Sequence, residues 1–116
     1  MKNSIYKELV AASSRPLVLS ILAGRDTYGY EIIKQVKRIS GGDLEWSGGM
    51  LYPLLHRLEK DGLIEGYWEP AEDGRPRKYY TLTTRGRRRL ATDRKSWRAV
   101  YGVLELSWRG GDVPAG

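Results

Sequence analysis

Basic side chains are concentrated in one part of this 116-residue chain. Residues 75–98 contain ten Lys or Arg and a single acid, Asp93, so this segment carries a charge of +9. The whole chain carries +6, which leaves −3 for the remaining residues. A concentrated positive field favours a polyanionic partner, and nucleic acid ranks ahead of a membrane surface. A solvated basic face would explain the charge alone equally well.

The chain offers few groups for catalysis or metal binding. His56 is the only histidine and there is no cysteine, so an ordinary transition-metal site is not expected. Neither a nucleophile with a His–carboxylate pair nor a phosphate-cradling glycine motif is recognisable. We therefore expect a protein that is not an enzyme, with no metal and no cofactor. The absence of cysteine favours a cytoplasmic location, and no apolar run approaches the roughly 20 residues that span a bilayer.

Residues 47–62 have the pattern of an amphipathic helix. Leu51, Leu55 and Leu58 recur at i, i+4 and i+7 on one face. Ser47 suits the N-cap, and a glycine at position 62 suits the end. The opposite face is small, polar or aromatic, and it carries Gly49, Tyr52, Pro53, His56 and Lys60. Such a face fits the major groove of DNA, although an ordinary amphipathic helix would also present a solvated face.

Two short segments after this helix, residues 63–68 and 78–83, predict a β-hairpin because they are rich in aromatic and β-branched residues. Their connection contains three basic side chains, Arg75, Arg77 and Lys78. Pro76 stiffens the loop, so these side chains would lose less entropy on contacting phosphates or the minor groove. The alternative is a charged loop that only keeps the hairpin soluble.

The N-terminal half predicts further helices. Residues 4–12 form a short amphipathic helix, residues 13–16 interrupt it, and Pro16 suits the first turn of a buried helix that ends at Gly24. Thr27 is expected to cap a third helix, and residues 44–46 to add a short strand beside the hairpin. The pairs 67–68 and 79–80 face one another across the hairpin, and we expect one aromatic residue of each pair in the core.

A last helix is expected from a Thr83 cap to about Trp108. Its apolar residues repeat every seven positions, a spacing typical of a coiled-coil seam. Because this stripe is too long for one small domain to cover, we expect a second copy to pack on it. The residues expected at that interface are Leu9, Leu90, Trp97, Val100, Leu104 and Trp108. Trp97 is either a structural seam residue or, with its symmetric copy, an aromatic wall for a flat hydrophobic ligand.

Three segments of the chain closely resemble the PadR family of transcriptional regulators. They read YGYEII at residues 28–33, MLYPLLHRLEKDGLI at 50–64 and GRPRKYYTLT at 74–83. Their order and spacing match as well, and the resemblance is strong from about residue 17 to residue 90. It implies a dimeric winged-helix repressor, with the helix from Ser47 in the major groove, the wing beside it and the last helix dimerising.

The single short C-terminal helix is similar to the short-tailed subfamily, which includes repressors of multidrug-efflux pumps. In a well-known member, a tryptophan preceded by serine stacks on flat drugs at the dimer centre, and Ser96-Trp97 matches that position. The resemblance therefore implies an effector site at Trp97. Its expected residues are Trp97, Asp93, Arg94 and Tyr101.

These observations predict an α+β, mostly α fold. We expect an N-terminal arm and winged helix-turn-helix over residues 1–83, a dimerisation helix over 84–108 and a tail over 109–116. The protein would be a repressor that binds a pseudo-palindromic operator in double-stranded DNA as a homodimer and is released by a hydrophobic or aromatic effector. The alternative is a winged-helix protein-interaction module with no effector. The expected DNA-binding residues are Ser47, Gly49, Met50, Tyr52, Pro53, His56, Arg57, Lys60, Arg75, Arg77 and Lys78.

Overall fold

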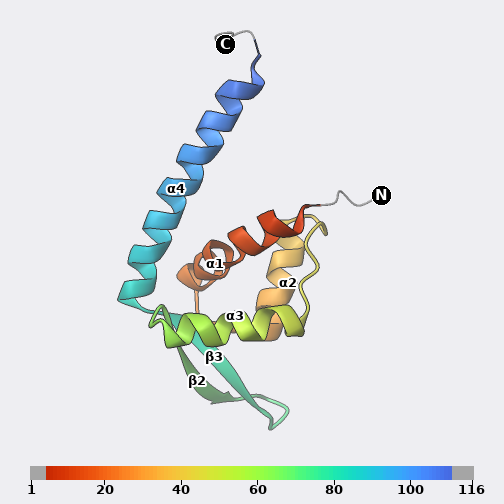
Figure 1. Cartoon of the computed structure of the whole chain (residues 1–116). Helices are drawn as coiled ribbons and strands as arrows, with labels where there is room; N and C mark the ends of the chain where they lie inside the picture. Colours follow the sequence, from red (N-terminus) through yellow and green to blue (C-terminus); the bar gives the residue numbers. More distant parts are fainter. Residues whose placement is uncertain (1–4, 111–116) are drawn as a thin grey trace.

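A computed structural model describes residues 5–110 as four helices and a small antiparallel sheet (Figure 1). The helices are α1 (Lys7–Gly24), α2 (Gly29–Ile39), α3 (Gly48–Lys60) and α4 (Thr84–Trp108). The strands are β1 (Thr27–Tyr28), β2 (Ile64–Pro70) and β3 (Pro76–Leu82), in the spatial order β1-β3-β2. Helices α2 and α3 form the helix-turn-helix, and the β2–β3 hairpin forms the wing. The predicted α+β, mostly α winged helix-turn-helix is confirmed.

The hydrophobic core lies where α1, α2 and α3 meet the base of the sheet. Val18 and Leu19 of α1, Ile32 of α2 and Leu51 and Leu55 of α3 are completely buried. The sheet adds Ile64, Tyr80 and Leu82, and the first part of α4 adds Leu90. Burial of these side chains is the main force that holds the four helices and the wing together.

Helix α1 is a single helix with Pro16 inside it, so the predicted interruption at residues 13–16 is wrong. The hydroxyls of Ser13 and Ser14 donate to the carbonyl oxygens of Val10 and Ala11, at 3.2 and 2.8 Å. Proline removes only one backbone donor, and the burial of the apolar residues after it favours continuing the helix. The helix begins at Lys7 rather than at residue 4, which lies outside the described residues.

Thr27 does not cap a helix but belongs to β1, which corrects the prediction at this position. Thr27 and Tyr28 pair with Tyr80 and Tyr79 of β3 and so cover part of its free edge. Residues 44–46, predicted to add a short strand beside the hairpin, form no strand. Leu44 and Trp46 pack against the core instead.

Two predicted caps are confirmed by their hydrogen bonds. The Ser47 hydroxyl accepts from the Met50 amide at 3.2 Å and caps α3. The Thr83 hydroxyl accepts from the Gly86 amide at 2.9 Å and donates to the Gly62 carbonyl at 2.7 Å. Because Thr83 holds both the start of α4 and the glycine after α3, it fixes the end of the recognition unit against the last helix.

The wing is longer than predicted, since its strands pair from Ile64–Leu82 out to Pro70–Pro76. Tyr80 is buried and Tyr79 is half-buried, as expected for that pair. The prediction for the other pair is wrong, because neither Tyr67 nor Trp68 is in the core and Trp68 is 66% exposed. Trp68 borders an open groove beside Tyr30 and Tyr52 and is therefore not enclosed in the core.

Candidate nucleic-acid interface

Helix α3 runs through Pro53 without interruption and has one buried and one exposed face. Its four leucines are buried, whereas the side chains on the opposite face are exposed: Tyr52, Pro53, His56, Arg57 and Lys60. Ser47 and Gly49 are exposed at its N-terminal end. Met50 differs from the rest of the predicted set, because it is partly buried and packs against the core. The other predicted residues of this helix are brought together on one accessible surface.

Helices α2 and α3 approach closely where Gly29 faces Tyr52. A Cβ atom built on Gly29 would lie 2.6 Å from the Tyr52 hydroxyl oxygen and 2.8 Å from its ring. Only glycine fits there without moving the ring. The glycine between Tyr28 and Tyr30 therefore sets the packing of the two helices and the orientation of an exposed tyrosine on α3.

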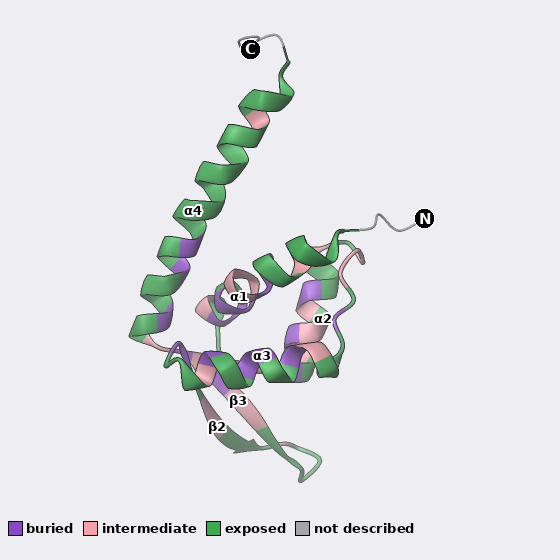
Figure 2. Cartoon of the chain, viewed as in Figure 1, coloured by how far each residue is buried: buried purple, intermediate pink, exposed green. Residues whose placement is uncertain are grey.

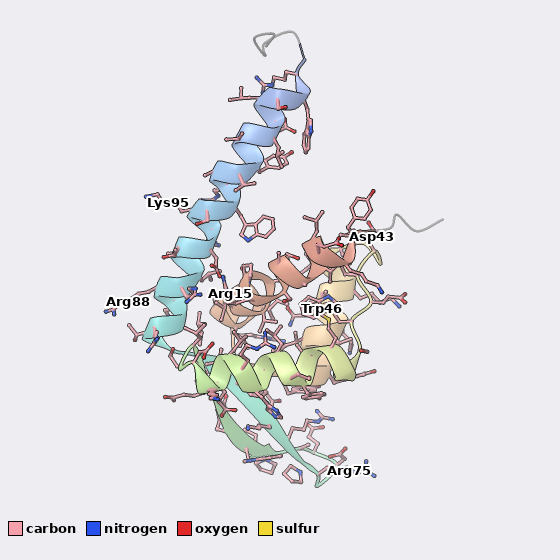
Figure 3. All side chains as sticks on the ribbon, in the orientation of Figure 1. Arg15, Asp43, Trp46, Arg75, Arg88 and Lys95 are labelled. Carbon is pink, nitrogen blue, oxygen red and sulfur yellow. The ribbon has the colours of Figure 1, made fainter. Side chains whose placement is uncertain are left out.

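Two of the three predicted basic residues of the wing carry charges that no described carboxylate pairs. Arg75 extends from the tip of the hairpin (Figure 3). The Arg77 guanidinium lies 4.7 Å from the centre of the Tyr28 ring and donates to the Tyr28 hydroxyl at 3.3 Å. Contact with the ring holds this cation in place without neutralising it. Both groups are suited to bind an anion such as a phosphate.

Lys78 has a different environment. Its ammonium group lies 3.2 Å from a carboxylate oxygen of Glu59 at the end of α3. Only 31% of its side chain is exposed. The structure therefore places Lys78 in a contact between the wing and α3. Glu59 was not among the predicted residues, because its pairing with Lys78 depends on the register of the hairpin.

A groove of about 400 Å³ separates the wing from the N-terminal ends of α2 and α3. Its walls are aromatic and basic, and its residues come from five elements: Tyr28 of β1, Tyr30 of α2, Tyr52 of α3, Trp68 of β2 and Arg77 of β3. Tyr28, Tyr30 and Trp68 were not among the predicted residues, although the repeated tyrosines around Gly29 mark the place in the sequence. Aromatic rings beside an arginine provide a surface suited to the sugar–phosphate backbone of DNA.

A tyrosine on the other face of the wing anchors it to the loop before β1. The Tyr67 hydroxyl donates to Asp26 at 2.8 Å, and the Tyr67 ring stacks on Tyr79. The hydrogen bond to this carboxylate raises the pKa of Tyr67 to about 12. The hydrogen bond and the ring contact therefore hold this face of the wing against the loop before β1.

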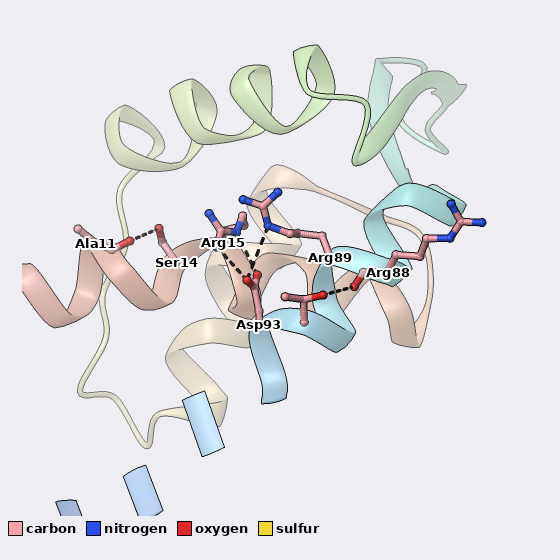
Figure 4. Close-up of polar contacts among 7 residues, drawn as sticks. Ala11, Ser14, Arg15, Arg88, Arg89 and Asp93 are labelled. Atoms are coloured by element: carbon pink, nitrogen blue, oxygen red, sulfur yellow. Dashed lines mark hydrogen bonds and ion pairs between the residues drawn. The ribbon is translucent and has the colours of Figure 1, made fainter. Parts of the chain in front are cut away.

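Asp93, predicted at an effector site, is buried at the junction of α4 with α1 (Figure 4). Arg15 donates to both of its carboxylate oxygens, at 2.8 and 3.0 Å, and Arg89 approaches one of them at 3.8 Å. The hydrogen bonds to Asp93 raise the pKa of Arg15 further above its usual value. The carboxylate is thus occupied within the chain, and it fixes the direction in which α4 leaves the head, which we define as residues 5–93.

The outer part of α4, residues 94–108, is exposed throughout except at Glu105 (Figure 2). Trp97, Val100, Leu104 and Trp108 are among its exposed apolar side chains. Leu9 of α1 is 50% exposed, whereas Leu90 is buried in the chain's own core. The structure therefore leaves the predicted interface residues accessible with the exception of Leu90.

A shallow depression of about 440 Å³ lies beside Trp97. Arg94 and Trp97 of α4 form one side, and α1, the end of α2 and the following loop form the other, with Leu17, Ile39 and Leu44. Tyr101 lies outside this depression, and its hydroxyl donates to Glu105 at 2.9 Å, which raises its pKa. Of the four predicted effector residues, the structure brings only Arg94 and Trp97 together here.

Residues 5–110 contain no group of three or more side chains that could hold a metal ion. Within the same range, no helix is both long and apolar enough to cross a membrane.

The sequence and the structure of this chain are similar to those of known proteins. Residues 18–92 match the transcriptional regulator PadR-like family. The transcriptional regulator Rv3488 of Mycobacterium tuberculosis is 34% identical over 78% of this chain and 80% of its own length. The crystal structure of a PadR-like transcriptional regulator from Bacillus cereus superimposes with a TM-score of 0.79 at 29% identity, covering 90% of this chain and 99% of that one.

A PadR family regulator from Clostridium difficile superimposes with a TM-score of 0.74 at 34% identity, covering 83% of this chain and 98% of that one. The family match covers β1, α2, α3 and the wing, which build the groove and the exposed face of α3, and it extends into the first part of α4. This chain therefore belongs to the PadR-like family of transcriptional regulators.

Proposed function

We propose that this protein is a repressor that binds a pseudo-palindromic operator in double-stranded DNA. The single observation that carries the proposal is the shared groove, because Tyr52 of α3 and Arg77 of the wing line it together. A recognition helix in the major groove and a wing on the flanking backbone would then be in contact with one DNA segment at once. Arg75 at the wing tip extends the same basic surface.

Each DNA-facing side chain has a role that its chemistry supports. Tyr52 and His56 donate or accept hydrogen bonds at base edges, while Arg57 and Lys60 bind guanine or phosphate. Ser47 and Gly49 let the start of α3 approach the DNA backbone, and Pro53 adds an apolar contact. Met50 supports the helix from the core side, where it packs.

We propose that the protein acts as a homodimer through the outer part of α4. Its large apolar side chains are all exposed to solvent, and large exposed apolar patches are rare in monomeric soluble proteins. Val100, Leu104 and Trp108 would pack against the partner's copies, and Leu9 would pack beside them. A two-fold symmetric dimer places its two recognition helices about one DNA turn, roughly 34 Å, apart, and so requires a pseudo-palindromic operator.

An effector site between the subunits completes the proposal. A flat hydrophobic or aromatic molecule would stack on Trp97 in the depression that Arg94 borders. Binding there would change the separation of the two recognition helices and release the operator by a population shift. In this scheme residues 1–83 bind DNA, 84–108 dimerise and carry the effector, and 109–116 form a tail. The protein would work in the cytoplasm, without a cofactor and without enzymatic activity.

The test of DNA binding is a footprint of the purified protein on the DNA upstream of its own gene. We expect protection of an inverted repeat whose half-sites are one helical turn apart. At about four phosphate contacts per subunit, the affinity should fall with salt at a log–log slope near −7. A slope near zero with no protected site, together with capture of an acidic protein at physiological salt, would favour a protein-interaction module instead.

The test of the effector site is fluorescence quenching by planar aromatic cations. Trp97→Ala should abolish the quenching and leave the dimer folded, because the indole is the proposed stacking surface. Trp68→Ala is the matched control, since Trp68 lies on the wing and its removal should leave the quenching intact. Undiminished quenching in Trp97→Ala would place the ligand elsewhere.

A further inference from the structure

One carboxylate at the end of α3 joins the recognition helix to both strands of the wing. The Oε2 atom of Glu59 accepts the backbone N–H of Gly66 in β2 at 3.1 Å. Its Oε1 atom accepts from the Nζ atom of Lys78 in β3 at 3.2 Å. We define these three residues as the Glu59 clamp. The C-terminal end of α3 lies beside the base of the hairpin in Figure 1, and the Glu59 clamp is located at this contact.

Glycine at position 66 leaves the space in which the Glu59 clamp forms. A Cβ atom on Gly66 would collide with Cε of Lys78 and would lie 3.0 Å from Oε2 of Glu59. The lysine side chain therefore crosses β2 through the space that the missing side chain leaves. It crosses close to the buried Tyr80 as well, with its ammonium group 5.5 Å from the ring centre.

The charges in the clamp set Lys78 apart from the other basic residues of the wing. About two thirds of both the Lys78 and the Glu59 side chains is covered, at 31% and 33% exposure. The lysine charge is balanced at contact distance, whereas no described carboxylate pairs with Arg75 or Arg77. Moving Lys78 to a phosphate would leave Glu59 unpaired next to the negatively charged backbone of DNA.

We propose that the Glu59 clamp fixes the wing relative to α3 and that Lys78 is a positioning residue rather than a phosphate contact. The proposal rests on the proposed DNA-binding function and revises the role of one residue that the sequence assigns to DNA. Its physical basis is that α3 and the wing must reach separate parts of one DNA segment together. A support that holds both elements before binding preserves that geometry.

The first test compares two neighbouring substitutions, Arg77→Gln and Lys78→Gln, each of which removes one positive charge from β3. A lost phosphate contact lowers the log–log salt slope by about 0.9 per site, or about 1.8 per dimer. We expect that decrease in Arg77→Gln and an unchanged slope in Lys78→Gln. An equal decrease in both variants would overturn the proposal, because it would show that Lys78 also contacts phosphate.

The second test needs no DNA and measures amide hydrogen exchange at Gly66. Glu59→Ala removes the acceptor of this amide, and we expect its exchange to become about tenfold faster, the factor that corresponds to losing one hydrogen bond to a charged group. Glu69→Ala is the matched control, because Glu69 is an exposed acid on the same strand. Equal exchange at Gly66 in Glu59→Ala and in the wild type would overturn the clamp.

The two tests separate the clamp from the function on which it rests. If the wild-type protein binds DNA without any salt dependence, the proposed function fails, and the exchange rate of Gly66 still decides whether the clamp exists. If DNA binding holds, Glu59→Ala should lose about tenfold in affinity for the operator and much less for unrelated DNA. Equal losses on both DNAs would remove the positioning role.

Discussion

The head and the outer part of α4 place their apolar side chains in opposite ways. In the head, leucines and valines of three helices and the sheet are enclosed by one another. In the outer part of α4, Trp97, Val100 and Leu104 are exposed to solvent at 38, 56 and 40%. Burial of apolar surface stabilises the head from within, whereas an exposed apolar surface commonly marks an interaction site.

The boundary between these two regions falls at the ion pair of Arg15 and Asp93. Up to this point α4 is part of the head, and its residues Gly86, Leu90 and Asp93 are buried. After it, residues 94–108 continue the helix for about four turns with nearly all side chains exposed, and Lys95 points away from the head (Figure 3). One helix thus serves both regions, and substitutions along it should separate stability of the head from assembly.

The largest effect is expected from a cavity in the head. Leu55→Ala removes a completely buried side chain of α3, and we expect the free energy of unfolding to fall by about 2–5 kcal/mol. Urea denaturation measures this loss. The same truncation at Leu104 should change the stability of the head by less than about 0.5 kcal/mol. Equal losses at the two positions would break the distinction between the regions.

The next effect concerns assembly. Leu104→Glu places a charge on the proposed dimer surface, and we expect dimerisation to weaken by about 100-fold because an unpaired carboxylate would be desolvated. Sedimentation analysis measures the dissociation, and the unfolding of the head reports that the fold is retained. Lys95→Glu is the control, since Lys95 points away from the head. A dimer that survives Leu104→Glu would move the interface to another surface.

A smaller effect is expected where the two regions meet. Asp93→Asn leaves Arg15 without its carboxylate, and we expect a loss of about 1.5–3 kcal/mol in the free energy of unfolding, nearer the lower value because 38% of the Arg15 side chain is exposed. Thermal or urea unfolding measures it, with Thr92→Ala as the control on the neighbouring position. A stability equal to that of the wild type would show that packing alone fixes α4.

The smallest expected effect is the dependence of stability on the ionisation of Tyr67 in the wing. The pKa of Tyr67 is raised to about 12 by the hydrogen bond to Asp26, whereas an unfolded tyrosine titrates near 10. Between about pH 10 and pH 12 the unfolded chain loses this proton while the folded chain retains it, so the stability from this bond is lost as the pH rises. Tyrosinate absorbance should reveal one tyrosine titrating near pH 12. Asp26→Asn should lower that midpoint towards 10, and an unmoved midpoint would contradict the assignment.

Features that depend on neighbours in sequence were predictable. Ser47 and Thr83 cap helices whose first turns follow them directly, and the leucine spacing of α3 identifies its buried face. The exposed stripe of α4 follows from the seven-residue repeat in the same way. In these three cases the pattern that predicts the feature lies within a few helical turns of it.

Features that depend on distant partners were not predictable. The two-residue strand β1 exists because Thr27 meets Tyr80, and α1 continues through Pro16 because the core lies beyond it. Asp93 was predicted at the effector site, because nothing near it in the sequence indicates that Arg15, 78 positions earlier in the chain, is its partner. The Glu59 clamp likewise requires the register of β2 with β3, which spacing alone does not determine.

The contact of Arg77 with Tyr28 has a thermodynamic consequence for association. A freely rotating arginine gives up about 1.5–2 kcal/mol of rotamer entropy when it is immobilised. Arg77 has already lost part of that freedom in the unbound protein, because the ring and the hydroxyl of Tyr28 hold its guanidinium. Removing the Tyr28 ring should therefore weaken DNA binding although every charge on the wing is kept. Tyr28 would contribute to the affinity by lowering the rotamer entropy that Arg77 loses on binding.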